Sequence, residues 1–305
     1  KGQQQATFQL YSTPLLLQFN TQEKQEYIVQ MNKNAQDFSI YLSTFDLALI
    51  SQVSPLFIEE KKMRELMSEL SISGQANEIY FRKKAGEINA LANFTDTSTQ
   101  YSQNIPGVLN LNGQLSYAQQ NLNLDLSASN GEIDFSQHFV APIPYNSFNA
   151  IVDLSILDDG WKLQAKDVAV SSSELNLTAD ITIDSLSEAE TTMSLLANIT
   201  DVDVSKIGHY YPLTSMSSDL VDYLNGALIG GKVPQAQVLL NGPLARFPFN
   251  NNEGVFVVDA ELTDATFKFE EQWPAIKSFA ANLNFTNNSM LITGRSGSLV
   301  GLDVN

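Results

Sequence analysis

Apolar and polar residues alternate with a period of two along most of the chain, the pattern typical of β-strands that cover one face and leave the other in water. Turn-forming residues such as Asp158-Asp159-Gly160, Ser129-Asn130-Gly131 and Asn287-Asn288-Ser289 separate the runs. Short polar connections of this kind favour antiparallel hairpins. The clearest alternating runs are residues 109–117, 122–128, 148–156, 161–165, 175–183, 256–262 and 279–285.

A unit of strand, polar turn and strand recurs at residues 148–165 and 279–293, with a weaker copy at 108–126. Repeats of one supersecondary unit predict an extended architecture in which each unit contacts its neighbours. We therefore expect an all-β fold with a few short helices: an extended, curled antiparallel sheet of repeated hairpins, a taco-like β-groove. A β-sandwich also consists of hairpins and remains an alternative.

Two segments have helical periodicity instead. Residues 55–70 place Leu66 and Leu70 on one face, and residues 218–228 form an apolar stripe after a capping Ser217 or Ser218. We expect Gly230-Gly231 to stop the second helix, and residues 38–50 to be a strand. The predicted organisation is an N-terminal part of the groove over residues 1–104 and a second region over 105–305, which we expect to form one continuous architecture within a longer chain.

Composition narrows the classes of function. The 305 residues carry 34 acidic and 17 basic side chains, for a net charge of −17, which argues against nucleic acid as a partner. The absence of cysteine fits an oxidising compartment. There is no apolar run of the roughly 20 residues that cross a bilayer, and no signal peptide. Because the chain ends within an alternating pattern, we expect any anchor or export signal to lie outside it.

The residues that could take part in catalysis do not predict an enzyme. His138 and His209 each stand alone, without metal-ligand spacing. The acidic pairs at 158–159 and 201–203 are typical of a turn and of a solvated strand edge. We expect no catalytic residues, no metal and no cofactor; an enzyme acting on glycans would need a cleft with perturbed carboxylates, and the sequence names none.

Several short motifs occur in order along the second region. They include Tyr210-Tyr211-Pro212, the run from Leu220 to Gly231, Asn241-Gly242-Pro243, Phe247-Pro248-Phe249 and Trp273-Pro274. Earlier motifs are Ile105-Pro106-Gly107-Val108, Leu111-Asn112-Gly113, Phe139-Val140-Ala141-Pro142-Ile143 and Asp159-Gly160-Trp161. In this order and spacing they resemble the YhdP branch of the AsmA-like family, strongly over about residues 105–305.

The resemblance implies more than the residue pattern does. Such proteins are bridge-like lipid transfer proteins, anchored in the inner membrane of diderm bacteria, whose periplasmic part is a repeating β-groove with an apolar interior. It implies a role in cell-envelope and outer-membrane lipid homeostasis, with phospholipid or another acyl lipid as partner. Both membranes would be reached through regions outside this chain. The resemblance does not predict an oligomeric state.

Apolar residues at alternate strand positions are the candidate lipid-binding surface, because each buried methylene contributes about 0.8 kcal/mol. Alternation does not fix which face points inward. A scaffold that binds partner proteins through sheet edges, without lipid, is the alternative. The residues that we expect to line the groove are Leu122, Leu124, Leu126, Val152, Leu154, Ile156, Leu175, Leu177, Ile181, Leu283 and Phe285.

Overall fold

A computed structural model describes residues 7–17, 25–53, 55, 61–102, 105–211, 213–214, 216–270 and 272–304. Strands account for most of this part of the chain, as the alternation predicts. The strands are β1 (Phe8–Tyr11), β2 (Leu15–Leu17), β3 (Gln25–Tyr27), β4 (Val29–Lys33), β5 (Asp37–Asp46), β6 (Ser73–Lys84), β7 (Glu87–Thr99), β8 (Gly107–Ala118), β9 (Asn121–Asp134), β10 (Ile143–Leu157), β11 (Gly160–Ser171), β12 (Asn176–Leu186), β13 (Thr192–Asp203), β14 (Leu228–Pro243), β15 (Val255–Phe267), β16 (Ile276–Thr286), β17 (Ser289–Leu299) and β18 (Leu302–Val304). The α-helices are α1 (Ile50–Val53), α2 (Lys61–Glu69) and α3 (Ser218–Ala227), and the 3-10 helices are η1 (Leu47–Leu49), η3 (Ser136–His138), η4 (Val204–Tyr210) and η5 (Leu244–Arg246).

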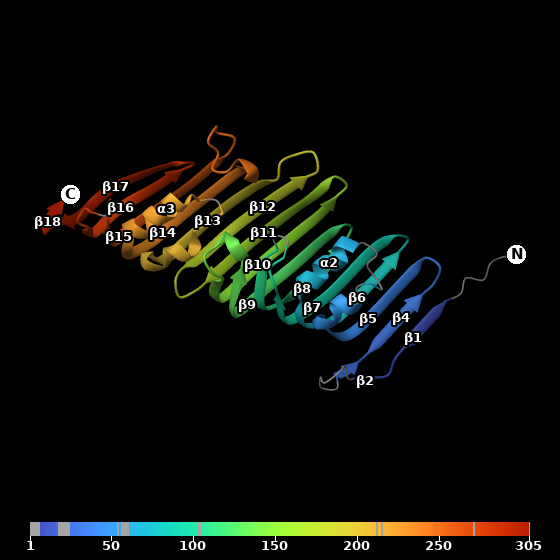
Figure 1. Cartoon of the computed structure of the whole chain (residues 1–305). Helices are drawn as coiled ribbons and strands as arrows, with labels where there is room; N and C mark the ends of the chain where they lie inside the picture. Colours follow the sequence, from blue (N-terminus) through green and yellow to red (C-terminus); the bar gives the residue numbers. More distant parts are fainter. Residues whose placement is uncertain are drawn as a thin grey trace. The chain divides into compact units, whose positions relative to one another are not determined.

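Hydrogen bonding joins 16 of the described strands into one sheet in chain order, from β1 through β4 to β18 (Figure 1). Among the described strands, only β2 and β3 lie outside that order, as a separate pair. β1 and β18 stand at the two ends of the order, so the sheet is not closed. This confirms the prediction of an all-β fold of successive antiparallel hairpins.

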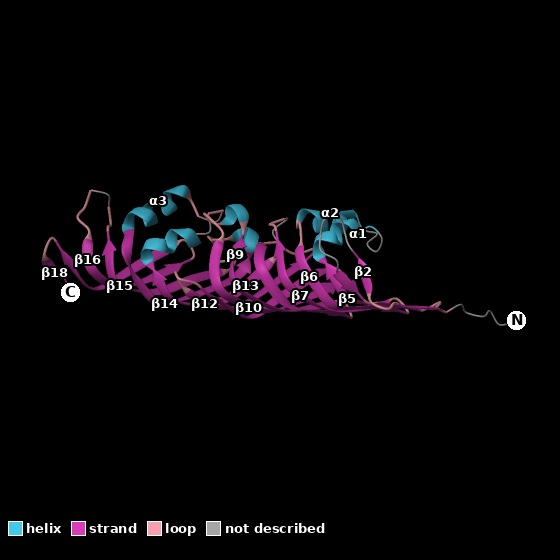
Figure 2. Cartoon of the chain, turned by 90° about the horizontal axis from the view of Figure 1, so that it is seen from below, coloured by secondary structure: helices cyan, strands magenta, loops and turns pink. Residues whose placement is uncertain are grey.

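The chain divides into two compact units. The first consists of Lys1–Ser129 with Ile151–Ile156, and the second of Asn130–Ala150 with Leu157–Asn305. Within the first unit, α2 lies on one side of the strands, and within the second, α3 does (Figure 2). Each unit therefore has one sheet face that carries helices and one that does not.

The second predicted helix is confirmed. α3 begins after Ser217, whose hydroxyl accepts a hydrogen bond from the Leu220 amide at 3.3 Å. Leu224 and Ala227 are its buried residues. The first predicted helix is present as α2, Lys61–Glu69, whereas residues 56–60 of that prediction lie outside the described residues.

Three local predictions are wrong. Residues 129–131 are not a turn, because β9 continues through them with Asn130 at a φ of 54°. Strand β5 ends at Asp46, whose carboxylate accepts a hydrogen bond from the Ala48 amide and starts η1. Gly230-Gly231 does not stop α3; the helix ends at Ala227 and both glycines lie in β14.

These two adjacent glycines are expected to differ sharply when substituted. Gly231 has a φ of +125°, and a Cβ there would lie 2.6 Å from the Cα of Ala265, whereas a Cβ at Gly230 meets nothing within 4 Å. We expect Gly231→Ala to lower the free energy of unfolding by about 1–3 kcal/mol. Gly230→Ala is the control, with a change within about 0.5 kcal/mol. Urea denaturation measures both, and equal effects would contradict the described register.

Candidate functional site

The strand register gathers apolar side chains on one face of the second unit. Residues directly opposite each other in paired strands project to the same face, so a row can be followed from strand to strand. Three such rows are almost entirely apolar, and together they form what we call the apolar face. The rows are Ala165, Ile181, Leu195, Leu240 and Phe256; Val168, Ala179, Ala197, Val238, Val258, Phe285 and Met290; and Val170, Leu177, Ile199, Ala236, Ala260, Leu283 and Ile292.

The opposite face of the same strands is mainly polar. Its side chains bond across strands: Gln237 donates to Asn198 at 3.1 Å, and Arg295 pairs with Glu261 at 2.6 Å. Leu196 and Leu239 are apolar exceptions, neighbours in register and 51% and 42% exposed. The second unit therefore has two chemically distinct faces.

The first unit shows the same separation. Asn123 donates to Asp153 and Ser155 donates to Asn121, each at 2.7 Å, so these four polar side chains share a face of β9 and β10. By alternation, the leucines and valine adjacent to them in sequence project to the other face. Those residues are Leu122, Leu124, Val152 and Leu154.

An apolar row also crosses the earlier strands of the first unit. The register joins Met31, Ile40, Phe81, Ala90 and Tyr117. Gln119 and Gln120 both have positive φ, as in a two-residue hairpin turn. Such a turn pairs Tyr117 with Leu122, so the row continues into β9.

The structure places the predicted lining residues as two groups. In the first unit, Leu122, Leu124, Leu126, Val152 and Leu154 are half-buried, and Ile156 is 45% exposed. In the second unit, Leu177, Ile181 and Phe285 are half-buried on the apolar face. Leu175 and Leu283 differ from the others, because they are buried within the hydrophobic core cluster.

Helices η4 and α3 cover one end of the apolar face of the second unit. Val204 of η4 and Ala227 of α3 belong to the same buried cluster as Ala236, Ala260 and Leu283. Val204 and Ala227 are each 1% exposed. That end is packed by the protein's own side chains.

An aromatic loop after β14 covers the other end. Phe249 is 1% exposed, and a Cβ at Gly242 would lie 2.8 Å from its ring. Phe247 packs on Phe256 with ring centroids 5.2 Å apart. Between the two covered ends, Ile181, Leu195, Val238 and Val258 remain half-buried. We call these four residues the floor.

A hydrogen-bonded cluster holds η4 at the start of β12. The Glu174 carboxylate accepts a hydrogen bond from the Tyr210 hydroxyl at 3.0 Å and lies 3.1 Å from Nδ1 of His209. Burial raises the pKa of Tyr210 to about 12, which keeps its hydroxyl protonated as a donor at neutral pH. His209 thus lies beside a carboxylate on the surface, in a structural contact.

No group of three or more His, Cys, Asp or Glu side chains among the described residues is arranged to hold a metal ion. None of the described helices has the length and apolarity needed to cross a bilayer.

Sequence reasoning missed most of the floor. Leu195 and Val238 each stand beside an apolar neighbour, in the runs Leu195-Leu196 and Val238-Leu239-Leu240, so alternation is broken there. One sequence signal identifies Leu195 as the inward residue. It lies two positions from both Met193 and Ala197 in β13, and residues spaced by two share a face.

Taken together, the fold and this face define an all-β protein built as an open sheet of successive hairpins, with one face apolar and the other polar. The family model described as YhdP protein matches residues 2–305, and the chain belongs to that family. It is 26% identical over 263 residues to the intermembrane phospholipid transporter YhdP of Escherichia coli (strain K12).

That alignment covers 85% of this chain and 21% of the E. coli protein, so the chain spans about a fifth of the length of this relative. The family membership confirms the predicted resemblance, and it supports the expectation that the chain is not an enzyme. No solved structure matches the chain.

Proposed function

We propose that this chain is a periplasmic segment of a membrane-anchored protein, and that it holds and conducts phospholipid along its apolar sheet face between the inner and outer membranes. The acyl chains would lie on the apolar rows, and the head groups would stay toward water. The inner-membrane anchor, and the contacts with both membranes, would belong to regions outside this chain. The name of the E. coli relative supports this assignment.

The observation that carries the proposal is the half-burial of large apolar side chains on a face with three continuous rows. In a dry core the corresponding residues are fully covered, as Leu262 and Ala281 are at 0% exposure. Ile181, Leu195, Val238 and Val258 have no such cover. Apolar surface left open in this way favours a ligand of the same chemistry, and hydrocarbon gains about 0.8 kcal/mol for each methylene removed from water.

The rows also match the shape of the proposed ligand. Each row runs across several strands, so a flexible hydrocarbon chain can move along it without breaking any hydrogen bond. The predicted lining residues Leu122, Leu124, Leu126, Val152 and Leu154 would serve in the first unit, and Leu177, Ile181 and Phe285 in the second. We place Leu175 and Leu283 beneath the helices, as supports of the lining rather than lipid contacts.

Mass spectrometry of an organic extract of the purified chain tests the proposal. We expect phospholipid in about stoichiometric amount or more, because the open apolar rows would otherwise contact water. A displacement experiment provides the control: filling the apolar face with a non-exchanging detergent should displace the lipid. A chain that purifies folded and free of lipid would contradict the proposal and favour the scaffold that binds partners through sheet edges.

A further inference from the structure

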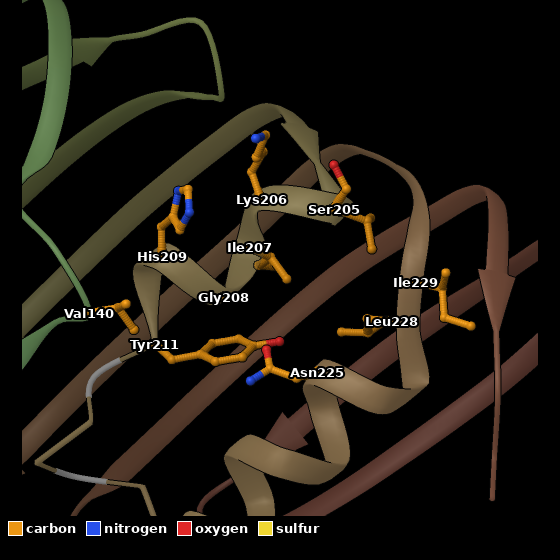
Figure 3. Close-up of a pocket in the computed structure, with 11 residues that line it drawn as sticks. Val140, Ser205, Lys206, Ile207, Gly208, His209, Tyr211, Asn225, Leu228 and Ile229 are labelled. Atoms are coloured by element: carbon orange, nitrogen blue, oxygen red, sulfur yellow. The ribbon is translucent and has the colours of Figure 1, made fainter. Parts of the chain in front are cut away.

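A pocket of about 430 Å³ lies between η4 and α3, in the second unit (Figure 3). Its apolar lining includes Val140, Val204, Ile207, Leu228 and Ile229, and its polar lining consists of Ser205, Lys206, His209, Tyr211 and Asn225. This volume is within the range of small-molecule sites. It is large enough to hold one portion of a lipid.

The hydroxyl of Tyr211 is the unusual group in this pocket. Tyr211 is 7% exposed, and its oxygen is the one buried side-chain polar atom in the described part of the chain that has no hydrogen-bond partner. Burial raises its pKa to about 12, so it is a protonated donor at neutral pH. Buried donors are nearly always paired in folded proteins, so an unpaired one on a side chain that lines a cavity points to a ligand that supplies the acceptor.

The surrounding side chains restrict the charge of that acceptor. In Figure 3 the Tyr211 ring spans the gap between η4 and α3, with its hydroxyl toward Asn225 and Leu228, while Lys206 and His209 point away from it. Lys206 and His209 line the pocket, but because their side chains point away from the Tyr211 hydroxyl, a carboxylate or phosphate bound at that hydroxyl would have no cation directed at it, which is unfavourable. A neutral carbonyl oxygen meets no such cost.

The remaining walls restrict the rest of the ligand. Val204 is part of the buried hydrophobic cluster, and Ile207 and Leu228 pack against that cluster, which also contains Ala236 and Ala260 of the apolar face. The pocket therefore adjoins the covered end of that face. A ligand that fits has a neutral acceptor joined to hydrocarbon.

We propose that this pocket binds the acyl ester group of a glycerolipid, whose carbonyl oxygen accepts a hydrogen bond from the Tyr211 hydroxyl. The inference rests on the proposed function and deepens it. η4 and α3 then form a binding site beside the apolar rows, and this site recognises the ester end of the lipid. Hydrocarbon alone would satisfy the floor, but only an ester or similar carbonyl satisfies Tyr211.

Tyr211→Phe tests this proposal, because it removes the hydroxyl and keeps the ring. A photoreactive amino acid replaces Val140, which lines the pocket and is 57% exposed, and the chain is offered an equimolar mixture of dioleoyl phosphatidylcholine and its di-O-alkyl ether analogue. We expect the ester lipid to be labelled about fivefold more than the ether, the factor that one net hydrogen bond supplies. In Tyr211→Phe the two should be labelled equally.

Two further measurements make each outcome decisive. With lipid removed from both proteins, the melting temperature of Tyr211→Phe should equal or exceed that of the unaltered chain, since the variant loses a buried, unpaired hydroxyl. A clear decrease in the lipid-free proteins would mean that the hydroxyl has a protein partner, and would overturn the proposal. The same ester-to-ether ratio with and without the hydroxyl would also overturn it. Added oleate should not compete, and preferential labelling of oleate would identify a free fatty acid instead.

A second photoreactive position separates this inference from the proposed function. Leu195 lies on the floor, away from the pocket lining. Labelling at Leu195 with none at Val140 would refute the ester site and leave lipid binding to the sheet intact. No labelling at either position would count against both.

Discussion

Replacing Leu195 with Asp is expected to reduce the phospholipid that the chain retains by about tenfold or more. Leu195 is half-buried in the middle of the apolar face, in register with Ile181 and Leu240. The substitution removes the contact of two or more methylenes, each worth about 0.8 kcal/mol, and places a carboxylate where hydrocarbon would lie, which adds a desolvation cost. A loss of about 1.4 kcal/mol already corresponds to tenfold.

The neighbouring leucine is the matched control. Leu196 projects to the polar face and is 51% exposed, so Leu196→Asp should leave lipid retention within about twofold, a difference below about 0.5 kcal/mol. Lipid is quantified by mass spectrometry of extracts, and circular dichroism shows that each variant melts cooperatively. Leu195→Ser is a second variant that carries no charge, and it should cause a smaller loss. Equal retention by the two Asp variants would refute the assignment of the faces.

Replacing Phe267 with Ala is expected to cause the largest loss of stability, about 3–5 kcal/mol of the free energy of unfolding. Phe267 is 2% exposed and lies in the cluster beneath η4 and α3. Its ring centroid is 4.8 Å from that of Phe269 and 5.8 Å from that of Phe279. Removing this ring leaves a cavity that the surrounding strands cannot close.

Phe269→Ala provides the comparison, because Phe269 is 39% exposed and its truncation should cost about 1 kcal/mol or less, as is usual for an exposed position. Urea denaturation followed by circular dichroism measures both variants. If Phe267→Ala were as mild as Phe269→Ala, the covered end of the sheet would not be a packed core. The division into a core end and an open floor would then be wrong.

The strands were predictable from sequence because their signal is local. Leu122, Leu124 and Leu126 alternate with polar residues, and the turns at Asp158-Asp159 and Asn287-Asn288 lie where expected, between β10 and β11 and between β16 and β17. Asn130-Gly131 has turn chemistry but is accommodated within β9, since a single residue with positive φ can be tolerated inside a long strand. Neighbouring strands therefore overrode a local preference.

The assignment of faces could not be made from sequence alone. Leu195 and Leu196 are chemically identical, and only pairing with Leu240 and Leu239 separates the inward residue from the outward one. The pocket at Tyr211 depends on contacts between η4 and α3, which are separate in sequence and carry no alternation. Its only sequence signal was the pair Tyr210-Tyr211 at the point where the alternating pattern stops.

A photocrosslinking scan along β13 tests the central claim most directly. A photoreactive amino acid is placed in turn at Met193, Ser194, Leu195, Leu196, Asn198 and Ile199, and lipid labelling is measured at each position. We expect labelling with a period of two, strongest at Leu195 on the floor and weaker at Met193 and Ile199, which share its face but lie toward the two covered ends. Labelling at Ser194, Leu196 and Asn198 instead, or equally at all six positions, would contradict the account.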